Sequence, residues 1–146
     1  MNETSDKTFW DSNLWIYISL DSQSEEDKIK KQVLASLFVN TEQIIISSQV
    51  LNEVVNVVLR KFKKTAEEAE ILVRKIMEQS VVIELKPKHT LDALNLKQAY
   101  NFSWFDALIV AAALDTQCNI LYSEDMQHGL IVNEKLQIVN PFVELP

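Results

Sequence analysis

Residues 44–60, IIISSQVLNEVVNVVLR, contain the pattern that decides the predicted fold class. Three consecutive isoleucines at residues 44–46 form a β-branched run that is typical of a strand buried on both faces. Ser47 and Ser48 follow, and either of them can cap a helix. The residues after them form one apolar helical face: Val50, Leu51, Val54, Val55 and Val58. A buried strand that leads directly into an amphipathic helix is the building unit of a parallel sheet covered by helices.

The same alternation continues on both sides of this unit. We expect further strands at residues 8–10, 81–83, 120–122 and 136–139, and helices at 14–18, about 24–38, 65–79, 90–100 and 104–114. Ser22 or Ser24 can cap the second of these helices, and Thr65 and Glu68 have the spacing of a capping box. On two helices the spacing predicts inward-facing residues: Ile29, Val33, Leu34, Leu37 and Phe38 on one, and Ile71, Leu72 and Ile76 on the other. The pattern predicts a single α/β domain over residues 1–146, with a central, mostly parallel sheet and helices on both faces.

Composition and charge limit the possible functions. A chain of 146 residues with 47% hydrophobic and 24% charged residues fits one globular domain. The formal net charge of −7 argues against nonspecific binding of nucleic acid over the whole surface. The basic run Arg60, Lys61, Lys63 and Lys64 could attract phosphate locally, although such residues also serve as solubilising charges at helix ends. Gly129 is the only glycine, which excludes a Gly-rich dinucleotide loop and a P-loop.

The sequence indicates a cytoplasmic protein without a membrane span. Residues 1–8 are polar, and Asp11 and Asn13 interrupt the apolar stretch after them, unlike the continuous apolar region of a signal peptide. The longest apolar run, residues 107–114, is much shorter than the roughly 20 residues that cross a bilayer as a helix. The single cysteine, Cys118, can form neither an internal disulfide nor a Cys-rich metal site, which fits a reducing interior.

Four acidic residues stand where predicted strands end and helices begin: Asp11, Glu53, Asp106 and Asp125. The carboxyl ends of parallel strands meet at one edge of a sheet, so these side chains could converge there. Clustered carboxylates need a cation, and a hard divalent ion such as Mg²⁺ or Mn²⁺ prefers carboxylate oxygen. This chemistry indicates phosphodiester hydrolysis.

Each acidic residue also has a purely structural explanation. Aspartate after a strand, such as Asp11, often makes a local turn, and Glu53 could pair with Arg60 on a solvated helix face. Asp106 follows Ser103 at capping-box spacing, where a carboxylate favours the helix dipole. The residues around Asp106 are nearly all apolar, however, and a carboxylate there is costly unless it is paired or bound to metal. The combination of the four, rather than any one of them, supports a site.

Four motifs, in this order along the chain, resemble those of PIN-domain ribonucleases, and in particular the VapC-type toxins of prokaryotic toxin–antitoxin modules. They are Asp11-Ser12-Asn13, residues 48–53 (SQVLNE), residues 103–113 (SWFDALIVAAA) and residues 123–129 (SEDMQHG). The resemblance extends to residues 138–142 and therefore covers essentially the whole chain. It implies a PIN-like three-layer α/β/α fold.

The resemblance implies a metal-dependent endoribonuclease that hydrolyses RNA phosphodiester bonds and leaves 5′-phosphate and 3′-hydroxyl ends. The acidic quartet that binds Mg²⁺ or Mn²⁺ would be Asp11, Glu53, Asp106 and Asp125. We expect Asp11 and Asp106 to be the central ligands, with Asp125 and Glu53 on a second metal or its waters. Asn13 and Ser123 match the polar positions that hydrogen bond to the quartet. Glu124 is an alternative ligand, although the Ser-x-Asp spacing favours Asp125.

The resemblance also implies a cognate antitoxin protein as partner and a homodimer. A departure from the common pattern is Met126-Gln127-His128-Gly129, where many members have an aromatic residue, and we assign His128 no role. An alternative is a catalytically silent RNA-binding or interaction module with the same fold. A phosphoryl-accepting receiver or a phosphatase is disfavoured, because the first motif is Asp-Ser-Asn and no lysine directly follows a late strand. DNA remains a possible substrate, and the resemblance favours RNA.

Overall fold

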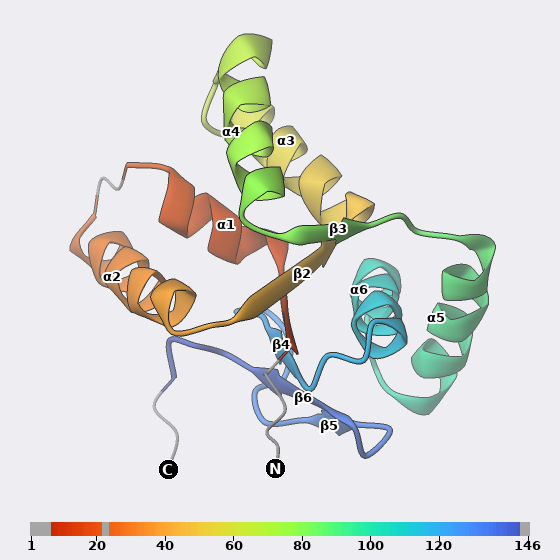
Figure 1. The fold of residues 1–146 in the computed structure, drawn as a ribbon. Helices are drawn as coiled ribbons and strands as arrows, with labels where there is room; N and C mark the ends of the chain where they lie inside the picture. Colours follow the sequence, from red (N-terminus) through yellow and green to blue (C-terminus); the bar gives the residue numbers. More distant parts are fainter. Residues whose placement is uncertain (1–6, 22–23, 144–146) are drawn as a thin grey trace.

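The computed structural model describes residues 7–21 and 24–143, and strands and helices alternate in the predicted order (Figure 1). The strands are β1 (Lys7–Trp10), β2 (Gln43–Ser47), β3 (Val81–Ile83), β4 (Ile120–Tyr122), β5 (Ile131–Val132) and β6 (Leu136–Val139). The helices are α1 (Ser12–Ser19), α2 (Glu25–Val39), α3 (Ser48–Arg60), α4 (Ala66–Glu78), α5 (Pro87–Ala99) and α6 (Trp104–Asp115). The sequence missed only β5 among these elements.

The strands form one mostly parallel sheet in the order β3-β2-β1-β4-β6-β5. Only β5 is antiparallel to its neighbour, β6. The chain builds outward from β1 to β2 and β3, and then crosses back to place β4 on the other side of β1. This reversal makes the carboxyl ends of β1 and β4 a topological switch point, which is where open α/β sheets bind ligands.

Helices cover both faces of the sheet, as the α/β/α prediction requires (Figure 1). Helices α1 and α2 pack together on one face, and α3 contacts α1 and pairs with α4. Helices α5 and α6 form the most extensive helix pair and lie on the opposite face. None of these helices, within the described ranges, combines the length and apolarity needed to span a bilayer.

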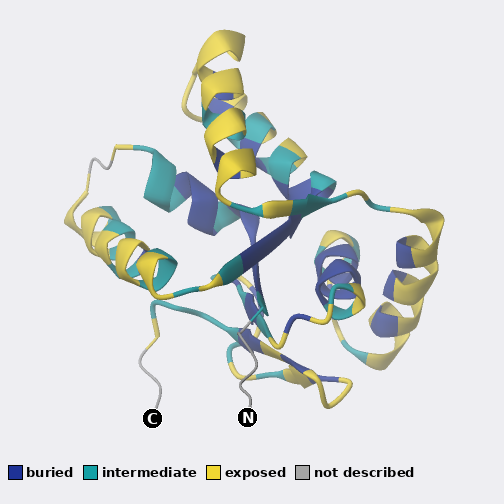
Figure 2. Cartoon of the chain, in the orientation of Figure 1, coloured by how far each residue is buried: buried dark blue, intermediate teal, exposed yellow. Residues whose placement is uncertain are grey.

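The core lies between the sheet and these two layers (Figure 2). Helix α6 is buried from Ala107 to Ala113, as its apolar sequence predicts. Trp10 and Trp15 are fully buried, and their ring centroids lie 5.3 Å apart. The inward assignment of Ile29 and Ile71 is wrong, because their exposed fractions are 59% and 53%. Helices α2 and α4 lie at the outside of their layer, so only a narrow strip of each meets the core.

Ile71 instead lines an open groove of about 380 Å³ between α1, α2, α3 and α4. Its other apolar lining residues are Ile18, Leu20, Phe38, Val58, Ala69 and Leu72. A helical apolar position that faces a groove has the same sequence spacing as one that faces the core. The periodicity of α4 therefore cannot separate the two.

Local capping explains where the helices begin. The predicted capping box is present, since Thr65 Oγ1 accepts from Glu68 N and Glu68 Oε1 accepts from Thr65 N. Ser24 caps α2, while the other candidate, Ser22, lies outside the described residues. Helix α5 begins at Pro87, earlier than the predicted residue 90, because proline suits the first turn of a helix.

Candidate active site

The topology brings two of the predicted motifs side by side. Trp10 of β1 pairs with Tyr122 of β4, and Asp11 N donates to Tyr122 O over 3.0 Å. Asp11 is therefore the first residue after β1, and Ser123 is the first after β4, at the same edge of the sheet. This edge is the switch point that the strand order creates.

Asp11 is buried and held in place by two hydrogen bonds. Its exposed fraction is 5%, and its Oδ1 accepts from Ser12 N over 2.7 Å as the N-cap of α1. Its Oδ2 accepts from Ser123 Oγ over 2.9 Å, and Ser123 Oγ itself accepts from Met126 N. Ser123, expected beside the quartet, thus ties the loop after β4 to the Asp11 carboxylate.

Helices α3 and α6 supply the next two carboxylates. Glu53 lies one turn into α3, where Gln49 Nε2 donates to its Oε2 over 3.1 Å. The same Gln49 Nε2 also donates to Phe105 O over 3.1 Å and so ties α3 to the first turn of α6, which carries Asp106. The alternative ion pair between Glu53 and Arg60 is absent from the described residues. Sequence reasoning missed Gln49, although it stands one helical turn before Glu53.

Charge interactions link the four carboxylates in pairs. The pKa of Asp11 is raised to about 6, chiefly by burial and also by the charges of Glu53 and Asp106, although the hydrogen bonds from Ser123 and Ser12 lower it. Burial also raises the pKa of Glu53, with a further rise from Asp106. The pKa of Asp106 is raised by burial and by the charge of Asp125, while the bond to Ser103 lowers it. The quartet is thus a chain of mutually repelling groups.

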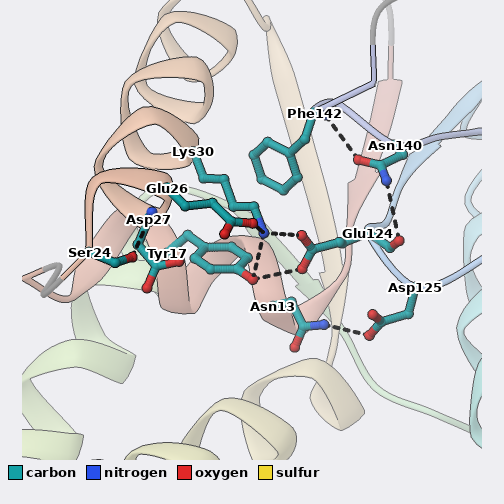
Figure 3. Close-up of polar contacts among 10 residues, drawn as sticks. All are labelled: Asn13, Tyr17, Ser24, Glu26, Asp27, Lys30, Glu124, Asp125, Asn140 and Phe142. Atoms are coloured by element: carbon teal, nitrogen blue, oxygen red, sulfur yellow. Dashed lines mark hydrogen bonds and ion pairs between the residues drawn. The ribbon is translucent and has the colours of Figure 1, made fainter.

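Asp125 and Glu124 are neighbours in sequence but have different partners. Figure 3 shows Asn13 Nδ2 donating to Asp125 Oδ2, over 2.5 Å. Glu124 points instead toward α1 and α2, where Tyr17 OH and Lys30 Nζ donate to its two carboxylate oxygens over 2.7 and 2.5 Å. Asp125, rather than the alternative Glu124, therefore faces Asp106. Nothing in the sequence signalled Lys30 as the partner of Glu124.

His128 also has a structural contact. Its Nδ1 accepts from Asn140 N over 2.9 Å, and Asn140 Nδ2 donates to Glu124 O over 3.4 Å. The adjacent Gly129 has a φ of 88°, a left-handed conformation that glycine adopts without strain. These contacts fix the return of the loop toward β6.

The donor chemistry of the site fits a hard divalent cation. All four carboxylates offer oxygen, and none forms an ion pair with a Lys, Arg or His in residues 7–21 and 24–143. Beside them, the buried Oε1 of Gln49 lacks a hydrogen-bond partner. Within the part of the chain that the structure describes, however, no three His, Cys, Asp or Glu side chains form a ready-made metal site. The fit therefore rests on donor type and uncompensated charge, not on a preformed cage.

Three solved structures share this fold. A toxin–antitoxin complex from Klebsiella pneumoniae has a TM-score of 0.68 and 18% identity over 92% of this chain and 98% of that chain. Mycobacterium tuberculosis VapC20, described as a toxin that cleaves the sarcin–ricin loop, has a TM-score of 0.62 and 14% identity over 78% and 86%. VapBC2 from Rickettsia felis, bound to a promoter DNA fragment, has a TM-score of 0.60 and 18% identity over 90% and 96%.

A comparison with curated protein sequences finds no significant match. The family model described as the PIN domain matches residues 8–129, a span that begins in β1 and ends at the last residue of the fourth motif. It includes all four carboxylates and both polar residues of the predicted site. The chain therefore belongs to the PIN-domain family.

Proposed function

We propose that this protein is a metal-dependent endoribonuclease that hydrolyses RNA phosphodiester bonds with Mg²⁺ or Mn²⁺. The observation that carries the proposal is the charge repulsion among Asp11, Glu53, Asp106 and Asp125, which come from four separate segments and form no ion pair with a Lys, Arg or His in the described residues. A structural role needs no such cluster, because four neighbouring carboxylates destabilise the fold through burial and repulsion. Divalent metals are the general requirement of PIN nucleases, and this donor set agrees with one.

The protein's own groups would prepare the site. Asp11 is fixed by Ser12 and Ser123, so its carboxylate is oriented before any ligand arrives. In the same way, Asn13 at the start of α1 orients Asp125 in the loop after β4. A bound divalent ion would supply the positive charge that neutralises the phosphate and lowers the pKa of an attacking water. Of the four ligands, we assign Asp11 and Asp106 the central position, and Glu53 and Asp125 the outer one.

A local cation offsets the net negative charge where RNA would approach. Lys61 and Phe62, just after α3, line a pocket of about 280 Å³ that also includes Asn13 and Tyr17. Lys61 is thus the member of the basic run that shares a pocket with Asn13, the partner of Asp125, and Asp21 and Asp27 line the same pocket. The ammonium group of Lys61 can contact a phosphate of the bound strand, and this contact would account for RNA binding by a protein with a net charge of −7.

We further propose that the protein is the toxin of a type II toxin–antitoxin system in the cytoplasm. Two of the similar structures are described as toxin–antitoxin or VapBC complexes, and the third as a toxin. The groove of about 380 Å³ that Ile71 lines has the apolar character that an amphipathic antitoxin helix would need. A homodimer remains part of the proposal on family grounds alone.

The proposal is tested by incubating the purified protein with a pool of end-labelled RNAs in Mn²⁺, Mg²⁺ or EDTA. The expected result is cleavage with either metal, none in EDTA, and products with 5′-phosphate ends. Asp106→Asn should lose the activity while melting at or above the wild-type temperature, and Asp92→Asn, an exposed aspartate of α5, should keep both the activity and the wild-type melting temperature. Equal cleavage by the wild type and Asp106→Asn would overturn the assignment.

A catalytically silent module with the same fold is the second candidate. It is favoured by one observation, the absence of a preformed metal cage from the described residues. RNA binding without cleavage under all metal conditions would support it.

A further inference from the structure

A second cavity opens directly beside the quartet. It has a volume of about 210 Å³ and lies between the α5–α6 loop and the loop that follows β4. Asp106 and Asp125 form one side of it, while Asp11 and Glu53 do not line it. Its size is below the roughly 300–1,000 Å³ of pockets for drug-sized ligands, so it suits a single small planar group.

The cavity has an apolar floor and a polar mouth. Phe102 and Met126 are buried apolar residues among its lining, and Leu130 adds further apolar surface. Asn101 and Gln127 stand exposed at the opening, one from each loop. Each amide presents a donor and an acceptor, and no hydrogen bond to either side chain is found among the described residues. We call this cavity the amide pocket.

The floor of the amide pocket is held rigidly. Lys97 Nζ donates to Phe102 O over 2.8 Å, which anchors the α5–α6 loop to α5. The rings of Tyr100 and Phe102 lie 5.6 Å apart, and Tyr100 OH accepts from Asn133 N over 2.9 Å. On the other side, Met126 N is bound to Ser123 Oγ. The pocket is therefore organised before a ligand binds, which lowers the entropic cost of binding.

We propose that the amide pocket binds one nucleobase of the RNA, next to the phosphate that the quartet attacks, and so sets the cleavage preference. The inference rests on the proposed nuclease function. Single-stranded RNA is recognised through bases that are splayed out, packed on apolar surface and hydrogen bonded along their edges. The apolar floor provides the first contact, and Asn101 and Gln127 provide the second.

The charges of the lining exclude a phosphate as occupant. Among the residues that the structure describes, no Lys or Arg lines the pocket, and its only charged groups are the carboxylates of Asp106 and Asp125, which repel anions. Because Asp106 and Asp125 form one wall of the pocket, a base bound there would lie beside the phosphate that the quartet attacks. The two amides provide the discrimination between bases, because a base edge must offer an acceptor and a donor in positions that match them.

The test maps cleavage sites in a randomised RNA pool by sequencing the product ends. Wild type should show a base preference at one position beside the cut. Asn101→Ala and Gln127→Ala should each relax that preference and slow cleavage at preferred sites about 5- to 150-fold, the value of one lost bidentate base contact. Cleavage at disfavoured sites should change little. Gln32→Ala, an exposed amide of α2, is the matched control and should behave as wild type.

Both amide side chains are exposed and make no hydrogen bond with any other described residue, so the variants should melt as wild type does. Unchanged base preference in both variants, with wild-type cleavage intact, would overturn the pocket and leave the nuclease proposal standing.

A readout independent of cleavage separates the two proposals further. Short RNAs with one 4-thiouridine at successive positions should crosslink, at one position, to peptides that contain residues 101–103 or 126–130. Crosslinks there without any cleavage would keep the pocket and refute the nuclease. Crosslinks only elsewhere would refute the pocket.

Discussion

Because Asp11 is buried, replacing it should raise the stability of the fold, although the same replacement should abolish the proposed activity. Burial raises the pKa of this carboxyl from 3.8 to about 6, despite hydrogen bonds from Ser12 and Ser123. In metal-free protein near neutral pH the group is ionised, enclosed and repelled by Glu53 and Asp106. Replacing it with a neutral isostere, Asp11→Asn, should therefore stabilise the fold while it abolishes activity.

The magnitude follows from linkage between protonation and folding. The pKa of Asp11 is higher in the folded protein than in the unfolded chain. The stability that its protonated form contributes is therefore fully present below about pH 3.8 and is lost as the pH rises through about 6. A shift of about two pKa units corresponds to about 3 kcal/mol. Asparagine keeps only one of the two accepted hydrogen bonds, which costs about 1 kcal/mol. The net gain for Asp11→Asn near pH 7.5 is about 2 kcal/mol.

The assay is urea and thermal unfolding of wild type and Asp11→Asn in EDTA at several pH values. For a chain of this length the gain equals a rise in Tm of about 4–8 °C near neutral pH. Near pH 3 the variant should instead be less stable, by about 1 kcal/mol, because Asp11 is protonated in both states and only the hydrogen-bond loss remains. Asp92→Asn controls for removal of a solvent-exposed charge. A loss of stability of equal size at both pH values would refute the reasoning.

Two further predictions concern contacts outside the quartet. Lys30→Met should lower the free energy of unfolding by about 2–3 kcal/mol in urea melts, because it removes the cation paired with Glu124. The side chains of Lys30 and Glu124 are only 16% and 21% exposed, so the remaining carboxylate is poorly solvated. Adding Glu124→Gln should restore part of the lost stability. A double variant as unstable as the sum of the single ones would argue against direct coupling. His89→Ala should lower the free energy of unfolding by about 3 kcal/mol, because His89 is buried and hydrogen bonds to both Lys86 N and Asp115. A Tm within about 2 °C of wild type, which corresponds to about 1 kcal/mol, would contradict this.

The sequence predicted the fold class because the fold class depends on local patterns. Isoleucine runs such as residues 44–46 specify buried strands, and their order with the helices specifies a parallel sheet. Once the strands are parallel, Asp11 and Ser123 must share one edge. Topology therefore brings Asp11 beside the loop that carries Asp125.

The hairpin of β5 and β6 was missed for a chemical reason. Its turn places Asn133 and Glu134 at φ values of 52° and 58°, where hairpins usually carry Asn-Gly or Asp-Gly. Glutamate at such a position gives no turn signal, so two strand residues, Ile131 and Val132, could not be recognised.

Contacts between distant residues were also beyond the sequence. Lys30 and Glu124 are separated by 94 positions, and neither lies in a motif that requires the other. Asp125 and Glu124 are adjacent in sequence, and their different roles likewise depend on their different partners in three dimensions, Asn13 for Asp125 and Tyr17 for Glu124. Spacing favoured Asp125, and the structure supplies the reason.

The claim that the quartet is a cation site is tested most directly by Mn²⁺ titration of metal-free protein, followed by electron paramagnetic resonance. We expect saturable binding to wild type and to Asp92→Asn, and affinity weakened by at least roughly 10- to 100-fold in Asp106→Asn. Equal Mn²⁺ binding by all three proteins, or no binding by wild type, would contradict it.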